Sequence, residues 1–191
     1  MTVIVAVSGG TRVCMAADSQ ATANGCKAVL NATNGKIVRR GPLLFGCGHL
    51  TVMDAVRYVM PEPEPAAALH EWTVTVFVPW LRGYLHARER MEKTSAGEAD
   101  FPCHVLVAHK GAFVQADAGT GVVSFERPYT ACGSGWMEAI GAMWEAHRVA
   151  AVCRDPRDDL VAEYIARAGV EGAIALDAGC GPPVCVEWTE P

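Results

Sequence analysis

The sequence lacks a long hydrophobic run. Although 51% of its 191 residues are hydrophobic, no segment approaches the ~20 consecutive apolar residues that a membrane-spanning helix needs. Its first residues also lack the basic segment, apolar segment and small-residue cleavage site of a secretory signal. We therefore expect no membrane partner and a cytoplasmic location. The apolar content is ample for the core of one domain that covers residues 1–191.

Clustered positive charge is absent as well. The chain has 16 Lys and Arg residues against 21 Asp and Glu residues, which gives a formal net charge of −5. Its basic residues stand in short groups interleaved with acids, and a solvated helix face explains the group between Arg82 and Lys93. Because proteins bind nucleic acids mainly by placing Lys and Arg against phosphates, we expect no nucleic-acid partner.

Sequence patterns for metal binding are missing, although cysteine is not. The chain has eight cysteines and six histidines, but it has no Cys-x-x-Cys pair, and no histidine stands beside cysteines at ligand spacing. Most of the cysteines lie in apolar runs, where a thiol behaves as a small hydrophobic side chain. We expect reduced structural cysteines, as in other cytosolic proteins, and neither a metal site nor a cofactor.

The apolar pattern alternates blocks of strands with blocks of helices. Segments rich in β-branched residues predict strands at 2–8, 12–18, 20–29, 36–47, 103–108, 112–116, 122–128, 173–177 and 183–188. Helical spacing predicts helices at 51–60, 66–93, 136–150 and 156–169. Thr51 and Asp54 resemble a capping box, and Pro79 should break or kink the second helix. This order favours an α+β fold, a four-layer α/β/β/α sandwich of two stacked, mostly antiparallel sheets flanked by helices.

Thr2 directly follows Met1, and a residue at this position can carry chemistry. Its side chain is small enough for removal of the methionine, which would give Thr2 a free α-amine. Such an amine has an ordinary pKa of ~7.7–8.0, so it can serve as the base for the hydroxyl of the same residue. On its own, Thr2 also fits the start of an ordinary first strand.

Further motifs follow Thr2 in a fixed order along the chain. They are the segments Asp18-Ser19-Gln20-Ala21-Thr22, Asn34-Gly35-Lys36-Ile37-Val38, Pro42-Leu43-Leu44-Phe45-Gly46-Cys47-Gly48, Ala131-Cys132-Gly133-Ser134-Gly135 and Asp177-Ala178-Gly179-Cys180-Gly181. Over almost the whole chain, this succession resembles the proteasome β subunits and their bacterial HslV-type relatives. Those proteins are N-terminal-nucleophile (Ntn) hydrolases, so the resemblance also implies a four-layer α/β/β/α fold.

The resemblance implies catalytic roles near the start of the chain. Thr2 would be the nucleophile, and Asp18 would hold Lys36. The charge of Lys36 would favour the threonine alkoxide and lower the pKa of the amine. Gly48 would supply a backbone N–H to the oxyanion, although counting back from Asp54 lands on Leu50. Without the resemblance, Asp18 reads as a polar residue at a strand end and Lys36 as a lysine at a surface strand edge.

The same resemblance implies roles for residues far downstream and for a substrate pocket. Ser134 and Asp177 would orient the amine and its water, and Cys180 stands where the family commonly has serine. A thiol is a weaker hydrogen-bonding group than a hydroxyl, so the amine would be held less firmly. Both glycine-flanked segments could also be simple turns. The pocket for the substrate side chain would be lined by small and mostly apolar residues, namely Ala21, Asn34, Val38, Gly48, Val52 and Val56.

The function implied by the resemblance is that of a threonine-type Ntn amidohydrolase, with a proteasome-like peptidase as the favoured form. It would act on a peptide or amide substrate without a cofactor, and it would form a homo-oligomer, which the resemblance implies is a ring. The sequence does not identify an ATP-dependent unfoldase partner. The alternative is a catalytically inactive structural or assembly subunit of the same fold, in which a retained Met1 blocks the amine of Thr2.

Overall fold

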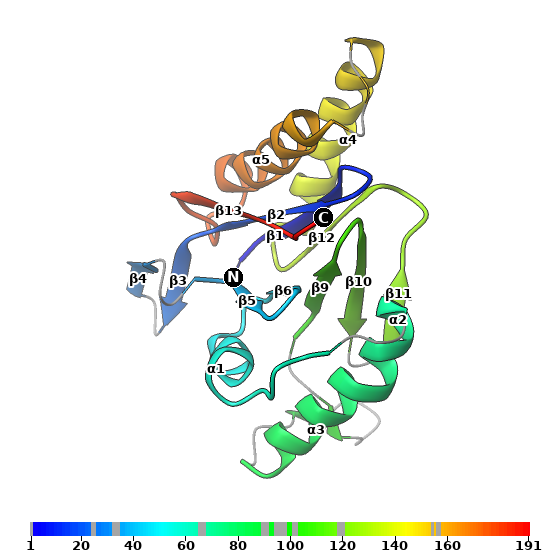
Figure 1. The fold of residues 1–191 in the computed structure, drawn as a ribbon. Helices are drawn as coiled ribbons and strands as arrows, with labels where there is room; N and C mark the ends of the chain where they lie inside the picture. Colours follow the sequence, from blue (N-terminus) through cyan, green and yellow to red (C-terminus); the bar gives the residue numbers. More distant parts are fainter. Residues whose placement is uncertain are drawn as a thin grey trace.

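Two antiparallel sheets lie face to face at the centre of the molecule (Figure 1). The computed structural model describes residues 2–23, 26–31, 35–64, 68–88, 92–93, 99–100, 103–117, 121–153, 155 and 158–191. One sheet has the strand order β12-β1-β2-β13, with β1 (Ile4–Ser8), β2 (Val13–Asp18), β12 (Tyr129–Cys132) and β13 (Val184–Trp188). The other has the order β11-β10-β9-β6-β5, with β5 (Ile37–Arg40), β6 (Leu43–Gly46), β9 (Val105–His109), β10 (Ala112–Asp117) and β11 (Gly121–Ser124).

Helices cover the outer face of each sheet (Figure 1). On the four-stranded sheet lie α4 (Trp136–Cys153) and α5 (Asp159–Leu176). On the five-stranded sheet lie α1 (Leu50–Tyr58), α2 (Leu69–Trp72), the π-helical segment Thr73–Phe77 and α3 (Val78–His86). This arrangement confirms the predicted α/β/β/α sandwich. Among the described residues, no helix combines the length and the apolar character needed to cross a membrane.

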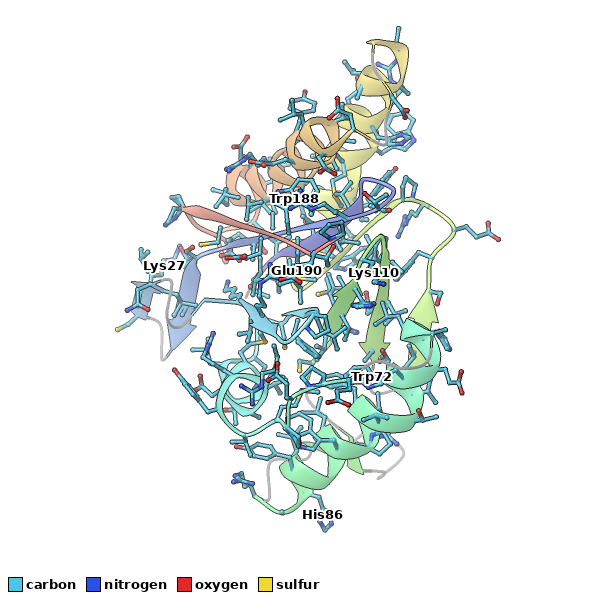
Figure 2. The ribbon with its side chains drawn as sticks, in the orientation of Figure 1. Lys27, Trp72, His86, Lys110, Trp188 and Glu190 are labelled. Atoms are coloured by element: carbon cyan, nitrogen blue, oxygen red, sulfur yellow. The ribbon has the colours of Figure 1, made fainter. Side chains whose placement is uncertain are left out.

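The hydrophobic core consists of three layers that follow from the alternation of side chains along each strand. In β1, Ile4 and Ala6 face the second sheet, where they pack with Leu44 and Leu106. The alternate residue Val5 faces the opposite way, toward α4 and α5. The third layer lies between the five-stranded sheet and its helices. It includes Trp72, which is labelled in Figure 2.

Three predicted strands differ from the observed ones because turns interrupt them. The segment 20–29 is a hairpin of β3 (Gln20–Ala23) and β4 (Cys26–Val29). The segment 36–47 is likewise a hairpin, since β5 and β6 pair across Gly41-Pro42, and proline has no N–H to donate to a ladder. The segment 122–128 is extended only as far as Ser124. The strand β12, which the sequence pattern did not predict, then begins at Tyr129.

A predicted strand at 173–177 was wrong, because α5 continues to Leu176. The last turns of α5 contain Gly169 and Gly172, and glycine weakens a helix interior. In the structure a β-carbon at Gly169 would lie 2.6 Å from Cγ of Met143, and one at Gly172 would lie 2.7 Å from Cβ of Ala142. The two glycines therefore let α5 approach α4 closely, and this packing gain outweighs their low helix propensity.

The expectations for the other helices need two corrections. Helix α1 begins at Leu50, and its N-cap residue His49 makes no side-chain capping bond, so Thr51 and Asp54 do not form the predicted capping box. Pro79 does not break the helical region, which continues from α2 through the π-helical segment into α3, and Pro79 lies just after the point where the π-helical segment ends. The strand β8 (Ala99–Asp100) pairs with β7 (Glu92–Lys93), where the predicted second helix would end, and residues 94–98 lie outside the described part.

Candidate active site

Thr2 lies just before β1, where the ends of the two sheets meet (Figure 1). Its side chain and backbone are largely enclosed, with 8% of the residue exposed. The carbonyl oxygen of Thr2 accepts a hydrogen bond of 3.2 Å from the N–H of Gly135. The start of the chain is thus held against the segment between β12 and α4, far away in sequence.

Asp18 ends β2 and organises the polar groups around Thr2. Its Oδ1 accepts hydrogen bonds from the Thr2 hydroxyl at 3.0 Å and from the Val3 N–H at 2.9 Å. Its Oδ2 accepts from the N–H groups of Gln20 and Gly181, both at 3.1 Å. The side chain of Asp18 is fully buried. A buried carboxylate with this many donors is fixed in position and compensated for its lost water.

Lys36 completes the environment of Asp18. Its ammonium lies 2.6 Å from Asp18 Oδ1, the oxygen that also accepts from Thr2, and its side chain is 2% exposed. Burial lowers the pKa of Lys36 below its ordinary value, and the hydrogen bond and charge of Asp18 oppose this effect. A cation is therefore held within the immediate surroundings of the Thr2 hydroxyl.

The backbone nitrogen of Thr2 faces a second polar chain. It donates to Ser134 Oγ at 3.0 Å, and Ser134 Oγ donates to Asp177 Oδ2 at 2.7 Å. Asp177 follows the last residue of α5, and its Oδ1 accepts from the Gly179 N–H at 2.8 Å. The bonds from Gly179 and Ser134 lower the pKa of Asp177, so its carboxylate stays ionised.

Cys180 packs beside this chain as a neutral thiol. Its sulfur lies 3.5 Å from Asp177 Oδ2, to which it donates. Burial first, and then the nearby carboxylates of Asp18 and Asp177, raise the pKa of Cys180 to about 12. It therefore serves as a weak donor to Asp177 and does not form a thiolate near neutral pH.

Two glycines approach Thr2 so closely that no side chain would fit. A β-carbon on Gly48 would lie 2.2 Å from Thr2 Cγ2, and one on Gly133 would lie 2.3 Å from the Thr2 carbonyl oxygen. Gly133 also has φ +98°, a backbone conformation that favours glycine. Gly48 stands two residues before α1, so the backbone of a helix N-terminus runs directly past the hydroxyl. Leu50, the alternative from counting, is the first residue of that helix and is partly exposed.

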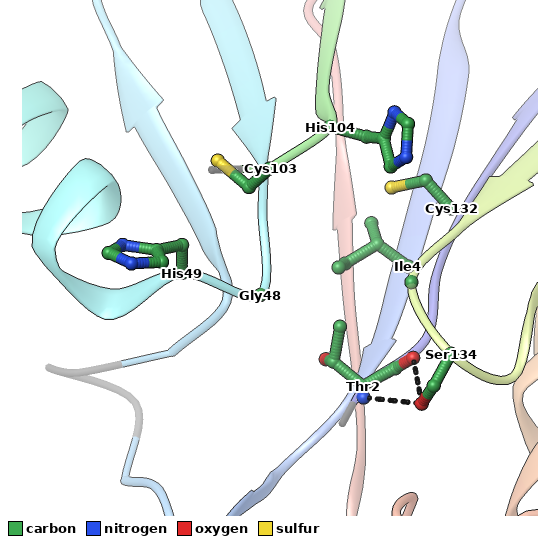
Figure 3. Close-up of a pocket in the computed structure, with 9 residues that line it drawn as sticks. Thr2, Ile4, Gly48, His49, Cys103, His104, Cys132 and Ser134 are labelled. Carbon is green, nitrogen blue, oxygen red and sulfur yellow. Dashed lines mark hydrogen bonds between the residues drawn. The ribbon is translucent and has the colours of Figure 1, made fainter. Parts of the chain in front are cut away.

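A cavity of about 270 Å³ opens beside Thr2 (Figure 3). Besides Thr2, Gly48 and Ser134, it is lined by residues that the sequence did not point to, namely Ile4, His49, Cys103, His104, Cys132 and Gly133. Most of them come from strand ends that are distant in sequence and are brought together by sheet pairing. An adjoining groove of about 540 Å³ shares His104, Cys132, Gly133 and Ser134 with the cavity and extends to Arg127 and Trp136.

The residues predicted for the substrate pocket are distributed differently. Val38, Val52 and Val56 belong to the core beneath the five-stranded sheet, and the last two have no exposed surface. They do not line the cavity at Thr2. Ala21 lies in β3 and is partly exposed, and Asn34 lies outside the described residues. The structure thus brings together the predicted residues Thr2, Asp18, Lys36, Gly48, Ser134, Asp177 and Cys180, but it does not bring the three valines to the cavity.

Known structures share this architecture from end to end. BPH from Thiobacillus denitrificans in complex with epoxomicin is 24% identical, with a TM-score of 0.76 over 98% of each chain. A second BPH structure from the same organism is 25% identical, with a TM-score of 0.76 over 98% of this chain and 97% of that one. Eukaryotic HslV from Trypanosoma brucei is 21% identical, with a TM-score of 0.62 over 99% of each chain. The chain has an HslV- and proteasome β-like Ntn fold.

No protein-family model matches the sequence, and no curated protein matches it either. Within the HslV-like fold, the cluster around Thr2 combines a hydroxyl, a buried cation, a fixed carboxylate and the backbone of a helix start. Among the described residues, no group of three or more His, Cys, Asp or Glu side chains is arranged to hold a metal ion.

Proposed function

We propose that this protein is a threonine-type Ntn amidohydrolase that cleaves peptides. The observation that carries the proposal is the shared oxygen of Asp18, which contacts both the Thr2 hydroxyl and the Lys36 ammonium. The HslV- and proteasome-like neighbours support peptide bonds as the class of substrate. As in the sequence-based expectation, removal of Met1 would turn the Thr2 nitrogen into a free α-amine.

The proposed reaction begins with attack of Thr2 Oγ1 on the carbonyl carbon of the substrate. The α-amine, directly or through a water, takes the hydroxyl proton, and the Lys36 ammonium favours the oxygen anion that develops. The backbone N–H of Gly48 donates to the oxyanion of the tetrahedral intermediate. The amine then returns its proton to the leaving nitrogen, which leaves an ester on Thr2. Water activated by the same amine hydrolyses this ester.

The chain of Ser134 and Asp177 would hold the amine during these steps. Because Asp177 stays ionised, it keeps the Ser134 hydroxyl proton directed toward itself, and the Ser134 oxygen then accepts from the amine. The amine is thereby oriented with its lone pair free for the Thr2 proton. Asp18 would have a positioning role, since it fixes Lys36 and the Thr2 hydroxyl without contacting the reacting carbonyl.

The assembly and location of the protein are part of the proposal. Ring-shaped homo-oligomers are the form expected from HslV- and proteasome-like relatives, and a cytoplasmic location agrees with the sequence. An ATP-dependent unfoldase partner is not identified by any residue of this chain. The second candidate function is that of an inactive structural subunit, which applies if Met1 is retained and the amine of Thr2 is blocked.

A cleavable N-terminal tag tests the proposal on one polypeptide. A tag followed by a protease site that exposes Thr2 keeps the amine blocked until the tag is cut. We expect turnover of short fluorogenic peptides only after cleavage, and we expect an intact mass of untagged protein that lacks one methionine. Equal activity of the tagged and cleaved forms would refute the Ntn mechanism. Inactivity of both forms, together with retention of Met1, would favour the structural subunit.

A further inference from the structure

Two cysteine sulfurs meet in the wall of the cavity beside Thr2. Cys47 Sγ and Cys103 Sγ lie 3.3 Å apart, and both residues are thiols. Cys103 lines the cavity, as Figure 3 shows, on the side where Gly48 and His49 lie. Cys47 is fully buried behind it and directly precedes Gly48 in the chain. One sulfur is thus accessible from the cavity and touches a second sulfur that is not.

Strand pairing holds the two cysteines in this relation. Cys47 follows the last residue of β6, whose Gly46 pairs with Leu106 of β9, and Cys103 lies two residues before the start of β9. The N–H of Cys47 also donates to the carbonyl of Lys36 at 3.0 Å. A disulfide has an S–S bond of ~2.05 Å, so bond formation would shorten the separation of the two sulfurs by about 1.2 Å.

Burial keeps three cysteines outside this pair protonated. Burial raises the pKa of Cys132, which also lines the cavity, so that it stays protonated. Burial likewise raises the pKa of Cys14 and of Cys180 to about 12. Since the thiolate is the species that attacks a disulfide, these three cysteines are expected to remain thiols under conditions that oxidise a reactive pair.

We propose that Cys47 and Cys103 are a modification site that takes a low-molecular-weight disulfide as its oxidant. The Cys103 thiolate attacks one sulfur of the oxidant RSSR and releases RS⁻, which leaves a mixed disulfide on Cys103. The Cys47 thiolate then attacks the Cys103 sulfur and releases a second RS⁻. Two protein thiols are oxidised to one disulfide, and RSSR is reduced to two RSH, which take up the two protons.

The disulfide would act on the backbone that carries the proposed oxyanion donor. It would tie Cys47, the neighbour of Gly48, to the segment before β9, and Gly48 already has no spare room against Thr2. Misplacement of catalytic groups by about 1 Å can cost roughly a hundredfold in rate. We therefore expect oxidation to lower peptide turnover by about tenfold to a hundredfold. This effect rests on the proposed function, whereas formation of the disulfide does not.

The test uses the folded full-length protein and oxidised glutathione. Peptide mapping by mass spectrometry should find a Cys47–Cys103 cross-link with the loss of two hydrogen atoms, which dithiothreitol reverses. Cys103→Ser should lose the cross-link, whereas Cys132→Ser, the matched control in the same cavity wall, should keep it. Unmodified thiols, a stable glutathione adduct without a cross-link, or a cross-link to another cysteine would each overturn the proposal.

Activity measurements then test the consequence separately. In protein that turns over peptide, glutathione disulfide should inhibit the wild type reversibly, and the ratio of treated to untreated activity should stay near one in Cys103→Ser. Full cross-linking with unchanged turnover would overturn the effect on Gly48. If the protein has no activity at all, the proposed function fails, but the mass measurement still decides whether the modification site exists.

Discussion

The hydroxyl of Thr2 and the ammonium of Lys36 contact the same oxygen of Asp18, at 3.0 and 2.6 Å. The oxygen belongs to a carboxylate with no exposed surface, and the lysine is almost as deeply buried. Because a buried charge needs both a counter-charge and hydrogen bonds, the three groups depend on one another. This dependence leads to different expectations for a change at each position.

Thr2→Ala should abolish peptide hydrolysis and leave the fold intact. The substitution removes the proposed nucleophile and one of several donors to Asp18, while the donors on Val3, Gln20 and Gly181 remain. Thr2→Ser should retain partial activity, since the hydroxyl survives but its β-branched restriction is lost. Fluorogenic peptide assays and circular dichroism on processed proteins check both. Wild-type turnover in Thr2→Ala would remove Thr2 from the mechanism.

Lys36→Ala should cost activity, and Asp18→Asn should cost both activity and stability. Asp18→Asn leaves the Lys36 charge buried without its partner, which costs ~3–5 kcal/mol of unfolding free energy for a fully buried pair. Activity should fall by several orders of magnitude in Lys36→Ala, because the alkoxide loses its cation. Urea denaturation measures the stability of each variant.

The control for this pair is Arg148→Ala on the outer helix α4. Arg148 and Glu145 form an ion pair in which both side chains are more than half exposed. Exposed pairs contribute little to stability, since water already solvates both charges. A loss of stability in Arg148→Ala as large as that in Asp18→Asn would contradict the importance of burial at the site.

Gly48→Ala should eliminate turnover, because its methyl group would overlap the Thr2 side chain. The matched control is Gly141→Ala in the middle of α4, where a β-carbon meets nothing within 4 Å. That change should leave activity unaltered and raise stability by roughly 0.5–1 kcal/mol, the usual gain of alanine over glycine in a helix. Full activity in Gly48→Ala would show that its backbone does not adjoin the reacting groups.

The layer order and the contacts of Thr2 could be predicted from the sequence, but the cavity could not. Alternating blocks of strand and helix patterns give the four layers, since each element must bury one apolar face. Asp18 and Lys36 follow from a resemblance in order and spacing. Val52 and Val56 fit the register for a pocket, but their helix turns both side chains into the core under β6.

The remaining differences arise from contacts between distant segments. The apolar run at the end of α5 has the composition of a strand, but in the structure it is helical and its glycines lie close to α4. The cavity wall joins residues near 48, 103 and 132, which strand pairing brings together. A local pattern does not contain such pairings. The contact between Cys47 and Cys103 has the same origin, so the sequence indicated only that both are cysteines in apolar surroundings.

The pH dependence of activity and of stability should run in opposite directions at alkaline pH. Burial lowers the pKa of Lys36, so its ammonium loses the proton at a lower pH than the ~10.4 of an ordinary lysine. Turnover should therefore begin to fall at an alkaline pH below ~10.4. The reason is that the neutral side-chain amine of Lys36 no longer favours the Thr2 alkoxide.

The pH dependence of the free energy of unfolding follows from the difference in bound protons between the folded and the unfolded chain. Between the folded pKa of Lys36 and the ordinary lysine value, the unfolded chain binds more protons than the folded one, so the free energy of unfolding should rise with pH in this window. Lys36→Met removes the group and should flatten that rise. Rate profiles and urea denaturation across the same pH series, with wild type and Lys36→Met side by side, measure both quantities. Two results would mean that burial does not govern the charge of Lys36. One is a rate that falls only at or above the ordinary lysine pKa, and the other is a free energy of unfolding that changes with pH equally in both proteins.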